Sequence, residues 1–324
     1  MKNQDVVREL TRQGILVTPE ILKKVRDGGF GGKEIQQSPS PLPKKTKLSV
    51  KIKKPITEKK MSPEDFVAYY NTRYMGLRNI LLKKTDALSI NKAKHGFSEV
   101  SVIGMVGEKT AQGFVLEDAT GNISVVSRED VRKDDVVGVG GVVREGKLFQ
   151  KEIVWPDVPA TNKPTTIPGL KLLFTTFFND AIIDSLGEFS LVFAPGADGS
   201  GVAEPDKLKV VSDITSPCFA TIKKDGSEFV VLVYKPKNPP TSEDAVSLLK
   251  RRHLMPGVDE VLSATDQHMI EPVPDIFWVI SNQRGIETYN GVTVIISKEH
   301  DAVRFDAEIG EAHFAHETLV RGGL

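Results

Sequence analysis

One early segment of the chain places its apolar residues at helical spacing. Residues 62–65 offer a serine for the N-cap, a proline for the first helical position and two acids for the first turn, which together favour a helix start. Apolar side chains then recur every three or four residues, at Phe66, Tyr70, Tyr74, Leu77 and Leu81. This spacing lines one helix face, so the pattern predicts an amphipathic helix that ends near Lys84.

Alternation of apolar and polar residues follows the helix and is typical of short, half-buried strands. Turn-forming residues separate these strands, and the pair Gly140-Gly141 interrupts one of them, where a bulge or sharp bend would suit glycine. The predicted strands are 100–106, 113–117, 123–126, 136–143 and 148–154. Five short strands with a glycine kink favour a small closed barrel, with an OB-fold as the leading candidate.

Continuous apolar runs dominate the second half of the chain, as expected for strands of a buried sheet. The runs are 170–178, 190–194, 229–234, 276–280 and 292–296. Between the third and fourth runs, residues 241–253 have the pattern of a capped helix. The alternation of strands with helical signals predicts an α/β sandwich.

The first 60 residues differ in composition from the rest. Residues 1–30 predict a small helical N-terminal module. Residues 31–60 are rich in Gly, Pro, Ser and Lys and predict a basic flexible linker. Lys51, Lys53 and Lys54 in this linker are candidates for contacts with DNA phosphates, although such lysine-rich tethers are commonly just solvated spacers. The predicted order is a helical module at 1–30, a linker at 31–60, a helix plus OB-fold barrel at 61–160 and a sandwich at 161–324.

Composition narrows the class of protein. The chain has 324 residues, of which 40% are apolar and 27% charged, with a formal net charge of zero, so charge alone gives no argument for nucleic acid. No apolar run approaches the roughly 18 residues of a membrane span. The first residues carry charges rather than a secretory signal, and Cys218 is the only cysteine. We therefore expect a cytoplasmic protein with no membrane association.

Three stretches carry a resemblance to a known family. The first stretch consists of residues 102–106 and 116–121 together with Ile153–Pro159, the segment that leaves the predicted barrel. The second is Leu248–Pro256. The third is Val273–Phe277, followed by Tyr289–Val292. In this order the chain resembles the small subunit of the archaeal family D DNA polymerase (DNA polymerase II small subunit), itself similar to the B-subunits of eukaryotic replicative polymerases. The resemblance implies an OB-fold followed by a calcineurin-like phosphoesterase domain, here shortened.

Active members of that family resemble phosphoesterases that hold two metal ions with Asp, His and Asn ligands and attack a phosphodiester with a bridging hydroxide. The resemblance aligns four ligand motifs with residues 175–178, 196–199, 235–236 and 280–283, and the short span between 178 and 190 leaves no room for the remaining motif. Asp198 alone cannot rebuild a site. The resemblance therefore implies a degenerate domain with no catalytic residue, no metal ligand and no cofactor.

This resemblance implies a structural and regulatory role. We expect a non-catalytic small subunit that binds the large catalytic subunit of a family D DNA polymerase and meets DNA through that complex. Arg251 and Arg252 are the polar members of the stretch 248–256. Since arginine is enriched among interface hot spots, these two residues are the expected contacts with the large subunit.

Two alternatives stay open at the level of sequence. One is an active metal-dependent phosphoesterase or 3′–5′ exonuclease with rearranged ligands, which metal analysis and a nuclease assay would reveal. The other is a free-standing OB-fold protein that binds single-stranded DNA, which needs aromatic residues interleaved with basic ones on the barrel face. The barrel strands offer Phe114 and Phe149, with Trp155 at the exit.

Overall fold

The computed structural model of the protein describes residues 48–56, 61–95, 99–197, 208–236, 242–254 and 263–315. All of these residues belong to one compact unit. The predicted helical module at 1–30, and the predicted linker up to residue 47, lie outside the described residues.

Helix α3 (Pro63–Leu81) begins where the sequence predicts. Ser62 Oγ accepts a hydrogen bond from the Asp65 amide at 3.3 Å, and the Asp65 carboxylate accepts one from the Ser62 amide at 2.8 Å. This reciprocal cap satisfies two donors that the first turn leaves open. It explains why the helix starts at Pro63 despite the lysine-rich sequence before it.

The buried face of α3 matches the prediction only in its second half. Leu77 and Leu81 are buried as predicted, but upstream the face turns by one residue, so that Tyr69 and Arg73 are buried while Tyr70 is half-buried. An arginine is not expected in a core unless a partner compensates its charge. That partner belongs to a distant part of the chain, as described below.

Five strands close into a barrel: β2 (Glu99–Thr110), β3 (Gly113–Asp118), β4 (Gly121–Val126), β5 (Val136–Arg144) and β6 (Lys147–Val154). Their order around the barrel is β2-β3-β4-β6-β5, in which β4 and β6 are parallel and the other neighbours antiparallel. The interior holds alternate apolar residues of these strands. The short helix α4 (Ile90–Lys94) adds Ile90 and Ala93 to the same core.

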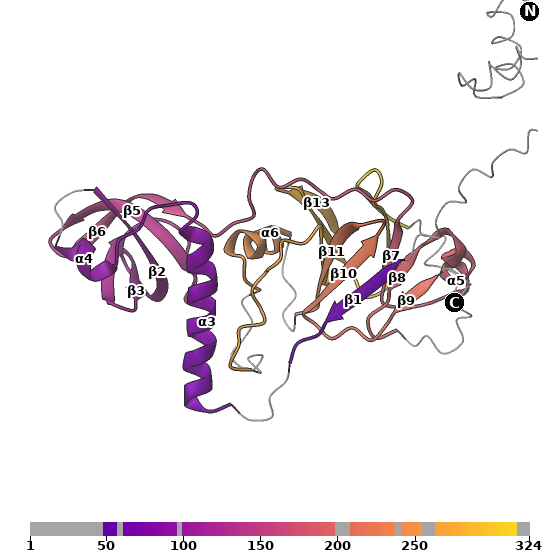
Figure 1. Ribbon diagram of the computed structural model, residues 1–324, viewed down its shortest axis with the longest axis horizontal. Helices are drawn as coiled ribbons and strands as arrows, with labels where there is room; N and C mark the ends of the chain where they lie inside the picture. Colours follow the sequence, from indigo (N-terminus) through magenta and orange to yellow (C-terminus); the bar gives the residue numbers. More distant parts are fainter. Residues whose placement is uncertain are drawn as a thin grey trace, which may run out of the picture. The chain divides into compact units, whose positions relative to one another are not determined.

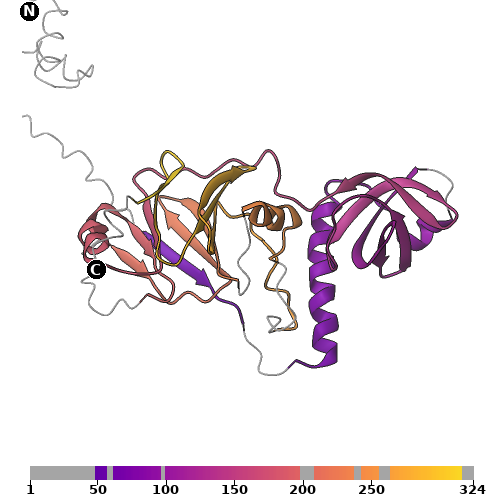
Figure 2. The ribbon, with the colours of Figure 1, turned by 180° about the vertical axis from the view of Figure 1, so that it is seen from behind.

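Helix α3 packs on the outside of the barrel. Leu77 and Leu81 of the helix form one apolar cluster with Ile103 of β2 and Val136 of β5, and the helix lies beside these strands in Figure 2. The predicted irregularity in β5 is also present, because the pairing of β5 with β6 shifts between Gly140 and Gly141. A Cβ atom on Gly141 would lie 2.1 Å from the carbonyl oxygen of Phe149, so only glycine fits there.

The rest of the described chain forms two sheets. The six-stranded sheet has the order β1-β10-β11-β12-β14-β13, and the five-stranded sheet has the order β16-β15-β7-β8-β9. The bounds of the first are β1 (Ser49–Lys53), β10 (Cys218–Lys224), β11 (Ser227–Tyr234), β12 (Ile276–Ile280), β13 (Gly285–Tyr289) and β14 (Val292–Ser297). Those of the second are β7 (Lys171–Thr175), β8 (Leu191–Phe193), β9 (Lys209–Val211), β15 (Ala302–Asp306) and β16 (Glu311–Phe314).

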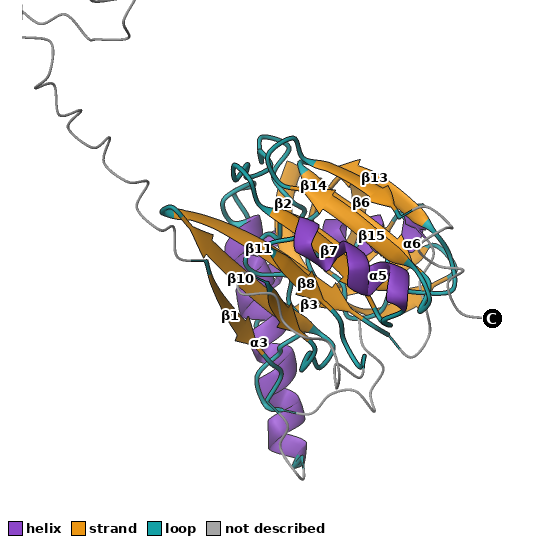
Figure 3. Ribbon diagram, turned by 90° about the vertical axis from the view of Figure 1, so that its right-hand side faces the viewer, coloured by secondary structure: helices purple, strands orange, loops and turns teal. Residues whose placement is uncertain are grey.

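The main core lies between the two sheets. Phe174 stacks on Phe193 at 5.3 Å between ring centroids and meets Trp278 of the opposite sheet edge-on at 5.1 Å. On the far side of the six-stranded sheet, helix α6 (Ser242–Arg251) packs Leu248 and Leu249. On the far side of the other sheet lie α5 (Asp180–Ser185) and the 3₁₀ turn η1 (Leu186–Glu188), with α5 visible beside β7 and β8 in Figure 3.

The predicted linker is wrong for its last part, since Ser49–Lys53 is strand β1. It pairs antiparallel with β10, with Ile52 opposite Ala220, and Figure 1 shows the two strands side by side. Val50 and Ile52 pack against the intersheet core, while Lys51 and Lys53 stay exposed. The lysines masked a period-two pattern that is typical of an edge strand, where charged residues discourage pairing with other chains.

Candidate functional site at the carboxyl ends of the strands

The positions aligned with phosphoesterase motifs follow the carboxyl ends of parallel strands. Strands β7 and β8 are parallel in one sheet, and β11, β12 and β14 are parallel in the other. Carboxyl ends of parallel strands meet at one edge of a sheet, where α/β proteins usually place their sites. Residues 175–178, 196–197, 235–236 and 280–283 occupy these ends.

Contacts between the following loops show that the ends of four strands gather. The ring of Phe177, after β7, lies 5.9 Å from the ring of His300, after β14. Lys235, after β11, forms an ion pair with Glu299 at 2.6 Å between Nζ and Oε1. The Ser281 amide, after β12, donates to the last carbonyl of β14 at 2.8 Å. The structure thus brings together the regions that the sequence aligned with separate motifs.

The described side chains at these ends do not form a ligand set for two metals. Thr175 is buried, and its hydroxyl bonds the backbone of Phe177 at 2.9 Å. Phe178 packs into an apolar cluster. Within the described ranges no group of three or more His, Cys, Asp or Glu side chains is placed to hold a metal ion. Asp198 lies outside the described residues.

One carboxylate is buried beside this edge, but an arginine holds it. Asp301 accepts hydrogen bonds from Arg284 Nε at 2.9 Å and from the Lys298 amide at 2.8 Å. A charge-assisted pair of this kind fixes a loop. Asp301 therefore shapes the turn after β14 and is not an open ligand position.

The structure places Arg251 in a buried contact within the chain. Its side chain is 6% exposed, and its Nε donates to Asp135 Oδ1 at 3.0 Å and Oδ2 at 3.2 Å. Asp135 precedes β5 of the barrel and is itself buried. The guanidinium also lies 5.1 Å from the centre of the Trp155 ring. Arg251 thus joins α6 to the barrel within the chain, and its expected contact with the large subunit stays a prediction.

Arg252 is also buried within the chain. It is 5% exposed, its Nε donates to the carbonyl of Ile270 at 2.7 Å, and its backbone carbonyl accepts from the Ile270 amide at 2.9 Å. Its φ of 53° lies in the left-handed region that few residues with side chains adopt. Both arginines of this signature stretch therefore form hydrogen bonds within the chain, and the expected interface at Arg251 and Arg252 stays a prediction.

The other signature stretches have similar internal contacts. Tyr289 donates its hydroxyl to the Asp157 carboxylate at 2.8 Å, and Asn290 Nδ2 donates to the Val158 carbonyl at 3.0 Å. The Asp275 carboxylate accepts from the Val230 amide at 2.7 Å. These bonds tie the barrel's exit segment and neighbouring strands to the six-stranded sheet. The residues that carry the family resemblance therefore build the architecture.

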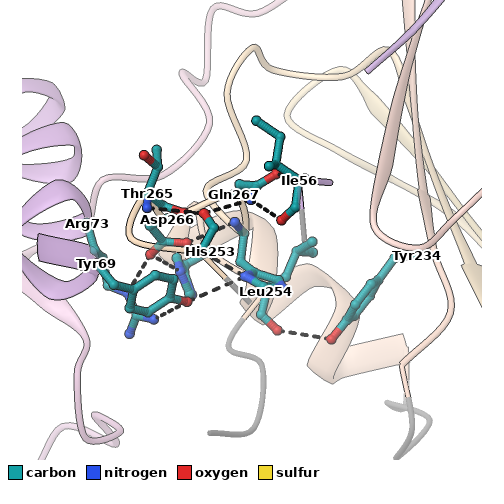
Figure 4. A network of polar contacts seen from close by, with 11 residues as sticks. Ile56, Tyr69, Arg73, Tyr234, His253, Leu254, Thr265, Asp266 and Gln267 are labelled. Atoms are coloured by element: carbon teal, nitrogen blue, oxygen red, sulfur yellow. Dashed lines mark hydrogen bonds and ion pairs between the residues drawn. The ribbon is translucent and has the colours of Figure 1, made fainter. Parts of the chain in front are cut away.

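A buried polar cluster that the sequence did not predict centres on Asp266 (Figure 4). Its Oδ2 accepts from Arg73 Nε at 2.8 Å and lies 2.7 Å from His253 Nε2, and its Oδ1 accepts from the His268 amide at 2.8 Å. Arg73 also donates to the Tyr69 hydroxyl at 2.9 Å. The only sequence signal was an arginine one position off the predicted helix face.

Burial and charge set the protonation of this cluster. Burial alone would raise the pKa of Asp266, but His253 and Arg73 outweigh burial and hold the pKa well below its usual range. Burial lowers the pKa of His268 to about 4 and also lowers the pKa of His253. At neutral pH the cluster therefore holds the Asp266 carboxylate paired with the Arg73 guanidinium, beside a neutral His268 imidazole, an arrangement suited to a buried joint.

The linker lysines lie at the edge of the six-stranded sheet. Lys51 and Lys53 are exposed on β1, whereas Lys54 forms an ion pair with Asp213. The pairing offsets the charge of Lys54, so Lys51 and Lys53 are the more available of the three toward a phosphate. None of the helices in the described ranges has both the length and the apolar character to cross a bilayer.

Comparisons with known proteins give one consistent result. The chain is 33% identical to the DNA polymerase II small subunit of Archaeoglobus fulgidus over 126 residues, which cover 35% of this chain and 26% of that protein. It is 30% identical to the protein of that name from Methanothermobacter thermautotrophicus over 174 residues, which cover 46% of this chain and 36% of that protein. It is 26% identical to the one from Thermoplasma acidophilum over 188 residues, which cover 48% of this chain and 38% of that protein.

The chain aligns with less than two-fifths of the length of each of these relatives. No family model matches it. All three relatives are archaeal and carry the same name. The resemblance seen in the sequence is therefore confirmed, and this chain is a relative of the small subunit of the archaeal family D DNA polymerase.

Proposed function

We propose that the chain is a non-catalytic small subunit that binds the large catalytic subunit of a family D DNA polymerase in the cytoplasm and assists DNA replication. The observation that carries this proposal is the contrast between two sets of residues. The stretches that resemble the family form contacts within the chain at Arg251, Tyr289 and Asp275. The strand ends that would hold metals present Thr176, Phe178 and Lys235 instead.

The fold assignment belongs to the same proposal. We propose that the barrel is an OB-fold, supported by its five short strands in the order β2-β3-β4-β6-β5 and the glycine bulge in β5. We propose that the two sheets are a shortened phosphoesterase-like sandwich, supported by parallel strand ends that gather at one edge.

Co-purification tests the partner. The full chain is co-expressed with a tagged large subunit of a family D polymerase from the same organism. Stoichiometric recovery through affinity and size-exclusion steps supports the proposal. A chain that elutes alone, under conditions in which an archaeal small subunit of known activity is retained, contradicts it.

A nuclease assay tests the absence of catalysis. The purified chain is incubated with 3′-labelled single-stranded and mismatched duplex DNA in the presence of Mn²⁺ or Mg²⁺. We expect neither release of the label nor shortening of the labelled strand. A nuclease activity that co-elutes with the chain and is lost on addition of a chelator would instead favour an exonuclease with rearranged ligands.

Contacts with DNA are proposed for Lys51 and Lys53, with Lys54 weaker because of its ion pair. Each phosphate neutralised on duplex DNA makes the negative slope of log affinity against log salt steeper by about 0.9. Replacing both Lys51 and Lys53 by glutamine in the complex should therefore make that slope shallower by about 0.9 for each lysine lost. Glutamine at Lys151, an exposed lysine paired with Glu99 on the barrel, is the matched control.

A further inference from the structure

A cavity on the barrel lies far in sequence from the strand ends described above. It has a volume of about 850 Å³ and lies between the β2–β3 turn, the end of β4 with the loop after it, and the start of β6. Gln112, Arg128, Lys147, Phe149 and Gln150 contribute to its lining. A volume of this size accommodates a nucleotide or a similarly sized group.

Phe149 distinguishes this cavity from an ordinary surface hollow. Among the Phe, Tyr and Trp side chains that the structure describes, Phe149 alone is exposed, at 42%. Its neighbour Leu148 points into the barrel core and is fully buried. The barrel therefore has its apolar layer filled without Phe149, so packing gives no reason for an aromatic ring on the outside.

The groups around Phe149 supply complementary chemistry. Lys147 lies two residues before Phe149, and alternate residues of a strand share a face. Arg128 adds a second cation, and the two glutamines add amide donors and acceptors. An aromatic face that stacks on a base, cations for phosphates and amides for base edges are the features by which proteins hold single-stranded nucleic acid.

Two carboxylates in the lining limit the number of phosphates that the site can hold. Glu129 and Asp130 oppose Arg128 and Lys147, but Lys109 pairs with Asp130 at 3.1 Å and adds a third cation. The small excess of positive charge suits one or two phosphates of a bound strand. It does not suit a long basic groove that contacts many phosphates.

The other two aromatic residues considered for base stacking on the barrel are buried. Phe114 is 1% exposed and lies in the barrel core, and Trp155 is 8% exposed between Lys250 and Arg251. We infer that the barrel has a short binding site for single-stranded DNA, in which one base stacks on Phe149 while Lys147 and Arg128 contact adjacent phosphates. This inference rests on the cavity alone and holds whether or not the chain binds a polymerase.

Fluorescence anisotropy with the full chain tests the site. The probe is a fluorescein-labelled oligothymidylate of eight nucleotides, titrated at low salt. We expect weak binding by the parent, and Phe149→Ala should weaken it about tenfold, in keeping with the value of one stacked base. Phe149→Trp should keep parental affinity, because tryptophan offers a ring at least as large.

Three controls make the result decisive. Leu88→Ala removes another exposed apolar side chain of comparable exposure, 48%, outside the cavity, and should leave binding unchanged. Lys147→Gln should make the negative slope of log affinity against log salt shallower by about 0.7, the value for one single-strand phosphate. Since Phe149 is exposed, Phe149→Ala should melt within about 2 °C of the parent.

The opposite outcomes are equally clear. Parental affinity in Phe149→Ala overturns the inference, as does an equal loss in Leu88→Ala. A chain that gives no anisotropy change up to about 100 µM, the weak end of ordinary non-specific binding, also overturns it. None of these outcomes depends on whether the large subunit co-purifies.

Discussion

Arg251 and Asp135 lie 116 residues apart in the sequence and form a buried ion pair, with 3.0 Å between Nε and Oδ1. The side chain of Asp135 is fully inaccessible, and burial raises its pKa despite the neighbouring arginine. Arg251 also donates to the Asp130 carbonyl at 3.3 Å. One guanidinium therefore links helix α6 to the loop that enters β5. We expect the loss of this link to lower the stability of the chain.

Arg251→Ala should destabilise the chain by about 3–5 kcal/mol, because it leaves the Asp135 carboxylate buried without its cation. Urea unfolding followed by circular dichroism measures the change. The matched control is Arg132→Ala, since Arg132 pairs with Asp244 at the surface, with both side chains about 40% exposed. That change should cost less than about 1 kcal/mol. Equal costs for the two variants would show that the buried pair has no special role.

Removal of residues 1–46 should leave the stability of the fold unchanged, whereas removal of residues 1–60 should lower it. The second change deletes β1, which covers one edge of the six-stranded sheet with Val50 and Ile52. Burial of two such side chains contributes about 2–4 kcal/mol, which corresponds to a melting temperature lower by roughly 5–15 °C in a chain of this size. Calorimetry of both variants measures the difference. Identical melting temperatures would mean that β1 adds no stability.

Stability should fall between pH 6.5 and 4 because of His268. Burial lowers its pKa from 6.5 to about 4, so in this window the unfolded chain binds the proton and the folded chain does not. Stability from the neutral imidazole is complete above pH 6.5 and is lost as the pH falls, by up to about 3 kcal/mol. Urea midpoints at pH 7, 6 and 5 should decrease in the parent.

The variant His268→Gln should reduce that slope, because glutamine does not titrate. His313→Gln is the control, since His313 is an exposed histidine with a side chain 70% accessible, and it should keep the parental slope. If His268→Gln retains the full pH dependence, the titrating group lies elsewhere.

Divalent metals should not stabilise the chain. A site with a dissociation constant of 1 µM would add about 4 kcal/mol at a thousandfold excess of metal, and melting with and without 1 mM Mn²⁺ detects that easily. We expect a shift below about 1 °C, because Thr176, Phe178 and Lys235 stand where the resemblance places metal ligands. A rise of several degrees that Asp198→Ala removes would show a metal site.

The barrel was predictable because its strands carry their own signals. Each predicted barrel strand corresponds to an observed one, since a period of two, turn residues and glycine are local features. Strands β1, β9, β10, β13, β15 and β16 were missed. In β1 the lysines hide the pattern, and Ser49–Lys53 becomes a strand only because β10 offers an edge to pair with.

The chemistry of the strand ends was predictable in a limited sense. The identities of Thr176, Phe178 and Lys235 are visible in the sequence, and their strands end on the carboxyl side of parallel pairs. The Asp266 cluster was not predictable, because Arg73 and Asp266 are 193 residues apart and no local pattern couples them. The pair of Arg251 with Asp135 was missed for the same reason, since the two residues are 116 positions apart.

Strand β1 also fixes the order in which the chain can fold during synthesis. The barrel's strands all follow one another between 99 and 154, so the ribosome delivers the barrel complete. Ile52 is made before the barrel, yet its partner Ala220 is made after it. At a synthesis rate of about 5–20 residues per second, Ile52 is made on the order of ten seconds before the strand with which it pairs. The alternating lysines that hid β1 from the sequence keep that waiting segment in water until its sheet exists.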